Sequence, residues 1–158
     1  MKKELAREKL EKIFYECDKH IKRLKSASDV MQDFMPLDSS SYKSLSEDRV
    51  VYIDQFLFRF AKLQDTMGQK LFRWILICMD EEVEGKPFVD ILNRLEKLSL
   101  IESANEWRTL REDRNELAHN YEDEPELMSE AINKLFKKHY KLIEIYTKIK
   151  DFYNKKCK

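Results

Sequence analysis

The chain has 158 residues, enough to bury a hydrophobic core, and 38% of them are charged. Its 30 basic and 30 acidic residues give a formal net charge of zero, which excludes a nucleic-acid-binding protein that works by bulk positive charge. No apolar run reaches the roughly 18 residues of a membrane-spanning helix, and the N-terminus lacks the apolar centre of a signal peptide, so we expect a soluble cytoplasmic protein.

With only 2 Gly and 3 Pro, the chain has few residues suited to tight turns. It contains neither an Asn-Gly nor an Asp-Gly hairpin signal, and no segment sustains an alternation of apolar and polar residues. The expected class is therefore all-α. We expect residues 1–158 to form a single domain, an antiparallel up-and-down bundle of four to five helices.

The first half of the chain contains two long stretches in which apolar residues recur at three- and four-residue steps, the period of an amphipathic helix. The first predicts a helix over Lys3–Met35, ended by Pro36 and followed by a polar loop over Leu37–Ser46. Next, Ser44-Leu45-Ser46-Glu47 fits a capping box, and the periodicity predicts a second helix that continues to about Met79.

Three further helices are predicted after a break that contains Gly and Pro. A short one covers Phe88–Leu98. Ser103 and Glu106 form another capping box, which begins the fourth helix. Pro125 is placed to begin a long fifth helix, whose tail Lys155–Lys158 is expected to be frayed.

The three cysteines, Cys17, Cys78 and Cys157, are odd in number and far apart in the sequence, which favours neither a disulfide framework nor a CxxC metal site. Cys17 and Cys78 fall on apolar stripes and are expected to be core thiols. The chain also lacks an HExxH pair and a glycine-rich phosphate loop. We therefore expect neither a metal nor a cofactor.

Two of the three histidines offer little sign of chemistry. His20 sits beside the apolar stripe of the first helix, which favours a structural or surface role. His139 lies among Lys137, Lys138 and Lys141, a run that favours a solvated face, with an auxiliary contact to phosphate as the alternative.

The segment Arg114-Asn115-Glu116-Leu117-Ala118-His119-Asn120-Tyr121 carries the richest chemistry. His119 can exchange a proton near neutral pH, and Arg114, five residues earlier, can bind a phosphate. On an ideal helix, residues five apart point about 140° away from each other. Either the helix ends near Ala118 to Tyr121, or a second subunit completes the site. A structural alternative is a helix C-terminus where His119 meets the negative end of the dipole and Tyr121 packs in the hinge.

The pattern Arg114-Asn115-x-x-x-His119-x-Tyr121 resembles the signature of the HEPN superfamily, and its trailing tyrosine resembles the HepT-like toxin branch. The expected bundle, a long second helix and a motif in the penultimate helix fit the same family. The resemblance implies a metal-independent endoribonuclease toxin of a type VII-like toxin–antitoxin pair. It also implies a homodimer, in which the motifs of both subunits line one cleft.

By the same resemblance Arg114 and His119 are catalytic, Asn115 is a supporting polar neighbour, and Tyr121 is the residue that a partner adenylylates. That partner is a minimal nucleotidyltransferase antitoxin of the MntA type. RNA cleavage needs a base for the ribose 2′-hydroxyl, an acid for the leaving 5′-oxygen and a cation for the phosphate. Two symmetry-related histidines and an arginine meet these needs.

The charges around the motif are mixed. Arg108 and Arg111 precede Arg114 at three-residue steps, and the three would form a basic stripe. Acidic side chains, which repel RNA phosphates, also flank the motif: Glu112, Asp113, Glu116, Glu122, Asp123, Glu124 and Glu126. Two other functions stay open. One is a non-catalytic, substrate-binding helical subunit of a nucleotidyltransferase, and the other is a helical module that binds partner helices through its apolar stripes.

Overall fold

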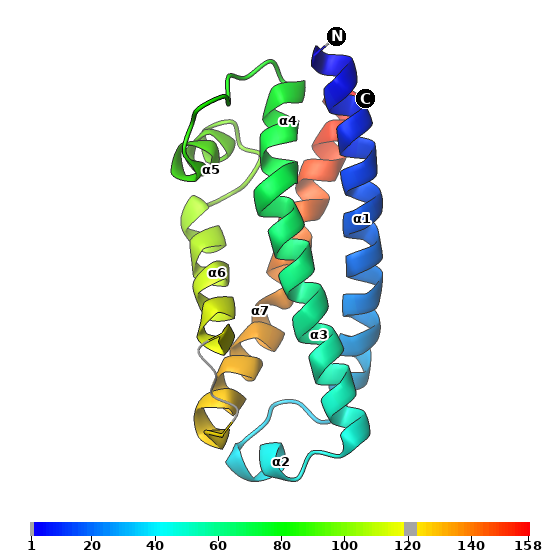
Figure 1. Ribbon diagram of the computed structural model, residues 1–158, viewed down its shortest axis with the longest axis vertical. Helices are drawn as coiled ribbons and strands as arrows, with labels where there is room; N and C mark the ends of the chain where they lie inside the picture. The colour runs from blue at the N-terminus through cyan, green and yellow to red at the C-terminus, as the bar shows by residue number, and fades with distance from the viewer. Residues whose placement is uncertain (1, 119–122) are drawn as a thin grey trace.

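The structure, a computed structural model, describes residues 2–118 and 123–158, and every regular element in these two ranges is a helix. Figure 1 shows an elongated bundle in which α1, α3, α4 and α7 run along the long axis, with α5 and α6 on one side of them. The predicted all-α class and the helical bundle are confirmed. Within the described ranges, no helix has the length and apolar character needed to cross a membrane.

The first helix is shorter than predicted, and a small helix replaces part of the predicted loop. α1 (Lys2–Met31) ends four residues before the predicted end, and α2 (Ser39–Lys43) follows. Asp38 caps α2, because its carboxylate accepts a hydrogen bond from the backbone N–H of Ser41 at 2.7 Å. The Ser41 hydroxyl accepts one in return from the backbone N–H of Asp38 at 2.8 Å. The prediction of a polar loop over Leu37–Ser46 was therefore wrong over Ser39–Lys43, which form α2.

The predicted second helix is one rod of three consecutive elements: α3 (Glu47–Thr66), the π-helical turn η1 (Met67–Leu71) and α4 (Phe72–Cys78). Ser46 begins the rod, because its hydroxyl accepts a hydrogen bond from the backbone N–H of Arg49 at 3.3 Å. Within η1, a Cβ on Gly68 would lie 3.1 Å from Cζ2 of the buried Trp107. Glycine at this position therefore allows the rod to pack closely against the helix that carries Trp107.

The second half of the chain forms α5 (Phe88–Lys97), α6 (Ala104–Ala118), α7 (Pro125–Phe152) and the π-helical turn η2 (Tyr153–Cys157). α6 begins as predicted, since the Ser103 hydroxyl accepts a hydrogen bond from the backbone N–H of Glu106 at 3.1 Å. The predicted frayed tail was wrong. Cys157 is only 3% exposed, and its carbonyl oxygen accepts a hydrogen bond from Nε of Arg7 at 2.7 Å, which holds the tail against α1.

The apolar stripes of these helices meet in a core built largely from aromatic and long aliphatic side chains. The largest fully buried ones include Trp107, Tyr153, Phe56, Phe60 and Phe72. Cys17 and Cys78 are completely buried, which confirms the prediction that they are core thiols. Burial is also the main cause that raises the pKa of Cys17 to about 12. The core leaves α6 with one side packed inward and the other toward solvent, and Arg114 and Asn115 of the polar motif lie on this helix.

Candidate active site

The predicted site falls partly within the described residues. Arg114 and Asn115 lie in the last turns of α6, and Asn115 is exposed. His119 and Tyr121 lie outside the described residues, so their predicted roles stay predictions. The described part of the site is therefore the C-terminal half of α6 with the parts of α3 and α7 that pack against it.

Arg114 is held by the carboxylate of Asp65, which no sequence pattern singles out. Its Nη1 donates to Oδ1 of Asp65 at 2.6 Å, and its Nη2 donates to Oδ2 at 3.2 Å. The two side chains are 28% and 32% exposed, so the ion pair lies at the edge of the α3–α6 contact. Two parallel hydrogen bonds fix the plane of the guanidinium group, and solvent still reaches part of both side chains. Asp65 is thus the residue that orients Arg114.

Two of the acidic residues beside Arg114 are neutralised by lysines of α7. The carboxylate of Asp113, which is only 5% exposed, accepts a hydrogen bond from Nζ of Lys138 at 3.0 Å. Both oxygens of Glu116 accept from Nζ of Lys134 at 3.2 Å. These ion pairs turn the two carboxylates toward α7 and offset their charge. The repulsion of phosphate that the sequence suggests is therefore smaller than a count of carboxylates implies.

Of the two described histidines, His20 is buried and His139 is half-buried. The His139 ring lies edge-on to Phe56, with ring centroids 5.2 Å apart, and its Nδ1 hydrogen-bonds the Phe136 carbonyl. The predicted solvated face therefore holds only in part at His139, because its half-buried ring packs against Phe56 and also lines an open surface pocket. Nδ1 of the buried His20 lies 2.9 Å from Nη1 of Arg59, which fits the structural role predicted for His20.

These surroundings predict a loss of stability in mild acid. Burial lowers the pKa of both His20 and His139, and the charge of Arg59 lowers that of His20 further. In the unfolded chain both rings titrate near pH 6.5, so protons bind the unfolded state first as the pH falls. The melting temperature should therefore drop between pH 7.5 and 5.5. His20→Gln and His139→Gln should each shrink that drop, and an unchanged drop in both variants would contradict this assignment.

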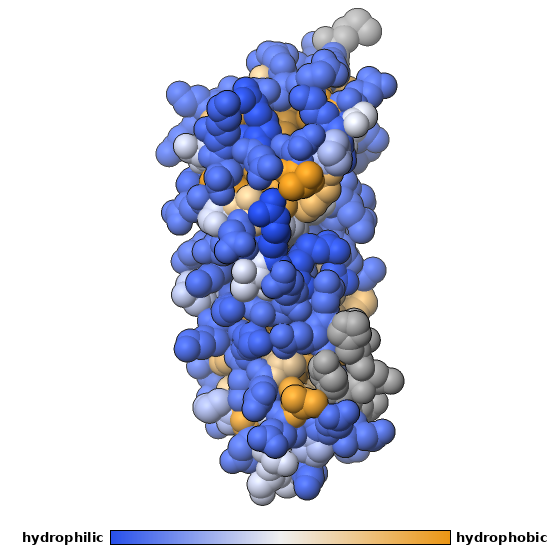
Figure 2. Space-filling view, turned by 90° about the vertical axis from the view of Figure 1, so that its left-hand side faces the viewer, coloured by the Kyte–Doolittle hydropathy of each residue, from blue (hydrophilic) through white to orange (hydrophobic). Residues whose placement is uncertain are grey.

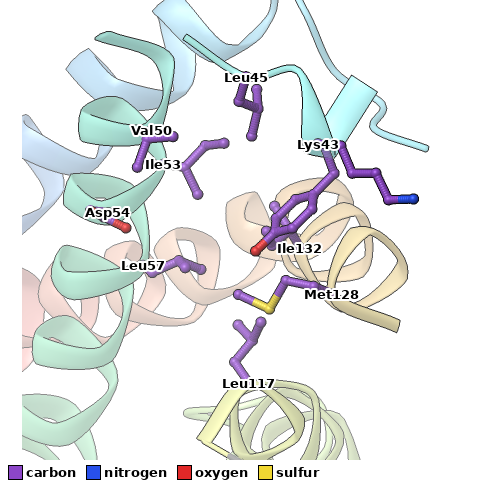
Figure 3. A pocket seen from close by; sticks show the side chains of 10 residues that line it. Lys43, Leu45, Val50, Ile53, Asp54, Leu57, Leu117, Met128 and Ile132 are labelled. Carbon is purple, nitrogen blue, oxygen red and sulfur yellow. The ribbon is translucent and has the colours of Figure 1, made fainter. Parts of the chain in front are cut away.

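A pocket of about 420 Å³ opens beside the end of α6. Its lining comes from α2, α3, α6 and α7 and from the segment between α2 and α3: Tyr42, Lys43, Leu45, Val50, Ile53, Asp54, Leu57, Leu117, Met128 and Ile132. Figure 3 shows Leu117 and Met128 pointing into the pocket from one side and Leu57 from another, while Lys43 extends away from it. Most of the lining side chains are aliphatic, and Tyr42, Lys43 and Asp54 add polar groups to the walls.

Within residues 2–118 and 123–158, no group of three or more His, Cys, Asp or Glu side chains is arranged to hold a metal ion. Comparison with protein-family models, curated proteins and solved structures finds no match for the chain. The functional argument therefore depends on the residues themselves. They provide an oriented arginine, an exposed asparagine next to it, and a pocket one turn further along α6.

Proposed function

We propose that the protein is a metal-independent endoribonuclease, a HepT-like toxin of the HEPN type, which acts as a homodimer and cleaves RNA with Arg114 and His119. The observation that carries the proposal is the bidentate ion pair with Asp65, which gives the Arg114 guanidinium one orientation near the end of α6. A cation of fixed orientation that precedes a histidine by five residues suits the cleavage of a phosphodiester.

In the proposed reaction, a neutral His119 accepts the proton of the ribose 2′-hydroxyl while that oxygen attacks the adjacent phosphorus. The bond between phosphorus and the 5′-oxygen breaks, and the protonated His119 of the partner subunit donates a proton to the leaving oxygen. Arg114 stabilises the negative charge that builds on the non-bridging phosphate oxygens. The products then carry a 2′,3′-cyclic phosphate and a 5′-hydroxyl.

The homodimer is part of the proposal because one helix cannot direct both groups at the same phosphate. If α6 continued as an ideal helix, residues five apart would point about 140° from each other. A two-fold axis beside the motif brings Arg114 of one subunit toward His119 of the other, and such an interface buries the same surface on each subunit. Asn115, exposed on α6, is then available to support the shared cleft.

The test is incubation of the purified full-length protein with a structured RNA in the presence of excess EDTA. Cleavage should persist, the products should end in a 2′,3′-cyclic phosphate, and sedimentation at micromolar concentration should show a dimer. Cleavage that is abolished by EDTA and restored by Mg²⁺ would reject the mechanism. A strictly monomeric active protein would reject the shared cleft.

A second candidate function is a non-catalytic subunit that binds substrate for a nucleotidyltransferase. It is favoured by the fact that both Nη atoms of Arg114 already donate to Asp65, as they would in a purely structural ion pair. The two candidates differ in one measurement: the binding subunit leaves RNA intact at any protein concentration, and it raises the activity of the transferase that it accompanies.

The same ion pair predicts the effect of changing Asp65. Asp65→Asn keeps the size of the side chain but loses the charge that orients Arg114, so kcat for RNA cleavage should fall by about tenfold or more with a smaller change in KM. The free energy of unfolding should change by less than about 1 kcal/mol, because the ion pair is partly exposed. Asp48→Asn, on the same helix and exposed, is the matched control. Faster cleavage in Asp65→Asn would show that the carboxylate competes with the substrate for Arg114.

A further inference from the structure

A second surface feature, distinct from the Arg114–Asp65 ion pair, is a groove of about 710 Å³ along the solvent side of α6. It lies between the rod, α5 and α6, and its lining combines three arginines with aromatic and small residues: Gly68, Gln69, Arg73, Phe88, Val89, Leu92, Trp107, Arg108, Arg111 and Glu112. Figure 2 views the side of the molecule that carries α5 and α6, and most of this surface is hydrophilic with small apolar patches. The groove is therefore a local basic site on a chain with no net charge.

The three arginines of the predicted basic stripe, Arg108, Arg111 and Arg114, do not share one environment in the structure. Arg114 turns to Asp65, whereas Arg108 and Arg111 line the groove. Neither Arg108 nor Arg111 forms an ion pair within the part of the chain that the structure describes. Glu112 is the one carboxylate in the lining. Two guanidinium groups that pair with no carboxylate of residues 2–118 or 123–158 therefore face a shared cavity.

Arg73 is held in place from the opposite wall. Its Nη1 donates to the carbonyl oxygen of Val83 at 3.4 Å, and its Nη2 donates to that of Lys86 at 3.1 Å. Carbonyl partners fix the guanidinium group without removing its positive charge. The two walls thus present cations to each other across the groove, an arrangement that favours an anionic ligand with more than one charge.

The rim of the groove can contact a planar group, and the buried ring of Trp107 supports the rim from below. Trp107 packs edge-on against Phe72, with ring centroids 4.6 Å apart, and Phe88 stacks on the same ring at 6.3 Å. Phe88 is half-buried at the groove wall, and Val89 beside it is 46% exposed. Rigid aromatic and apolar groups beside arginines are the combination that binds single-stranded nucleic acid, because the bases stack while the phosphates meet cations.

Two of the elements that line the groove also carry the Arg114–Asp65 ion pair. On α6, Arg111 precedes Arg114 by one helical turn. On the rod, Gln69 in the groove follows Asp65, the partner of Arg114, by one turn. A strand that lies in the groove is therefore led to the Arg114 end of α6.

We propose that this groove binds the backbone of single-stranded RNA, with Arg73, Arg108 and Arg111 contacting successive phosphates of the strand that Arg114 and His119 cleave. The proposal rests on the ribonuclease function proposed above, and it adds to it a substrate class, unpaired RNA, and a direction of approach. The arginines of the groove contribute to the affinity for RNA and take no part in the cleavage step. Substitutions of these arginines therefore weaken substrate binding more than they lower the cleavage rate at saturating RNA.

The test is fluorescence anisotropy of the full-length protein with a labelled 2′-O-methyl RNA of about ten nucleotides, within the usual span of single-strand sites. This RNA lacks the attacking hydroxyl, so binding is measured without cleavage. Arg108→Gln/Arg111→Gln should weaken binding about tenfold or more and lower the slope of log K against log salt by about 1.4, or about 0.7 per lost phosphate contact. Glu112→Gln should tighten binding a few-fold, and Arg23→Gln, exposed on α1, should change nothing.

The outcomes separate this proposal from the proposed function. If the double variant binds as wild type does while unmodified RNA is still cleaved, the groove assignment is overturned and the nuclease stands. If wild type neither binds nor cleaves RNA, both are overturned. If AMP or ATP binds with the same dependence on Arg108 and Arg111 and RNA does not, the groove holds a free nucleotide, which would support the transferase subunit instead.

Discussion

Arg114→Ala and His119→Ala should each lower the rate of RNA cleavage by at least about a hundredfold, the range expected when a charge-stabilising group or a general acid–base is removed. The reason differs between the two. Arg114→Ala removes the cation that meets the phosphate, whereas His119→Ala removes the group that exchanges protons with the 2′- and 5′-oxygens. Arg114→Lys keeps the charge but not the two parallel donors to Asp65, so it should recover only part of the lost rate. Initial rates on one RNA, measured with EDTA present, check all three variants.

The controls for this experiment follow from the position of each side chain. Arg114 is at the edge of the α3–α6 contact, so Arg114→Ala should cost less than about 1 kcal/mol of unfolding free energy despite leaving Asp65 without its partner. Arg23→Ala, an exposed position on α1, should keep full activity. If His119→Ala unfolds the protein and does not merely inactivate it, the structural alternative of a helix terminus gains support. If both alanine variants cleave RNA at the wild-type rate, the motif is not catalytic.

Most of the fold could be predicted because long amphipathic helices leave a regular pattern in the sequence. The three- and four-residue steps of apolar residues locate α1, the rod and α7, and Ser103 begins α6 as predicted. The predicted cap of the second helix was wrong by two residues, because Ser46 begins α3 whereas Ser44 lies at the end of α2. α2 has no such pattern, since five residues make little more than one turn and none of them is buried. The helix is capped by the reciprocal hydrogen bonds of Asp38 and Ser41. In the sequence these two residues look like part of a polar loop.

The error at the C-terminus has a different cause. The lysines of the tail suggested a solvated, frayed end, yet Ile149, Tyr153 and Cys157 recur every four residues and are all buried. They extend the apolar stripe of α7 to the end of the chain. The periodicity was therefore the better guide, because a helix with one buried face tolerates charged residues on its other side.

The site was harder to predict than the fold, because its described contacts join residues that are distant in the sequence. Arg114 and Asp65 are 49 positions apart, and no spacing rule connects them. In the same way, Lys134 and Lys138 neutralise acidic residues of α6 that the sequence shows only as neighbours of the motif. Sequence patterns predict which helix carries the candidate site, whereas tertiary packing determines which charges of that helix remain available to a ligand.

The proposed regulation by a nucleotidyltransferase predicts that Tyr121→Phe blocks modification and keeps the ribonuclease. The change removes only the phenolic oxygen that would accept an adenylate, and the aromatic ring stays. On wild type, each adenylate adds one negative phosphodiester and a bulky base two residues beyond His119. Repulsion of the RNA phosphates and steric exclusion then both oppose binding of the substrate, so modified wild type should lose RNA cleavage.

Intact-mass spectrometry after co-expression with a cognate minimal nucleotidyltransferase measures this directly. Wild type should gain adenylate-sized increments and lose nuclease activity, whereas Tyr121→Phe should show no increment and stay active beside the same partner. Tyr140→Phe is the matched control, because Tyr140 is 50% exposed on α7 and its loss should leave the modification intact. Increments that persist on Tyr121→Phe would place the modification elsewhere. If wild type stays unmodified beside an active transferase, the structural alternative is favoured, in which Tyr121 packs in the helix hinge. A ring that packs there offers no accessible hydroxyl.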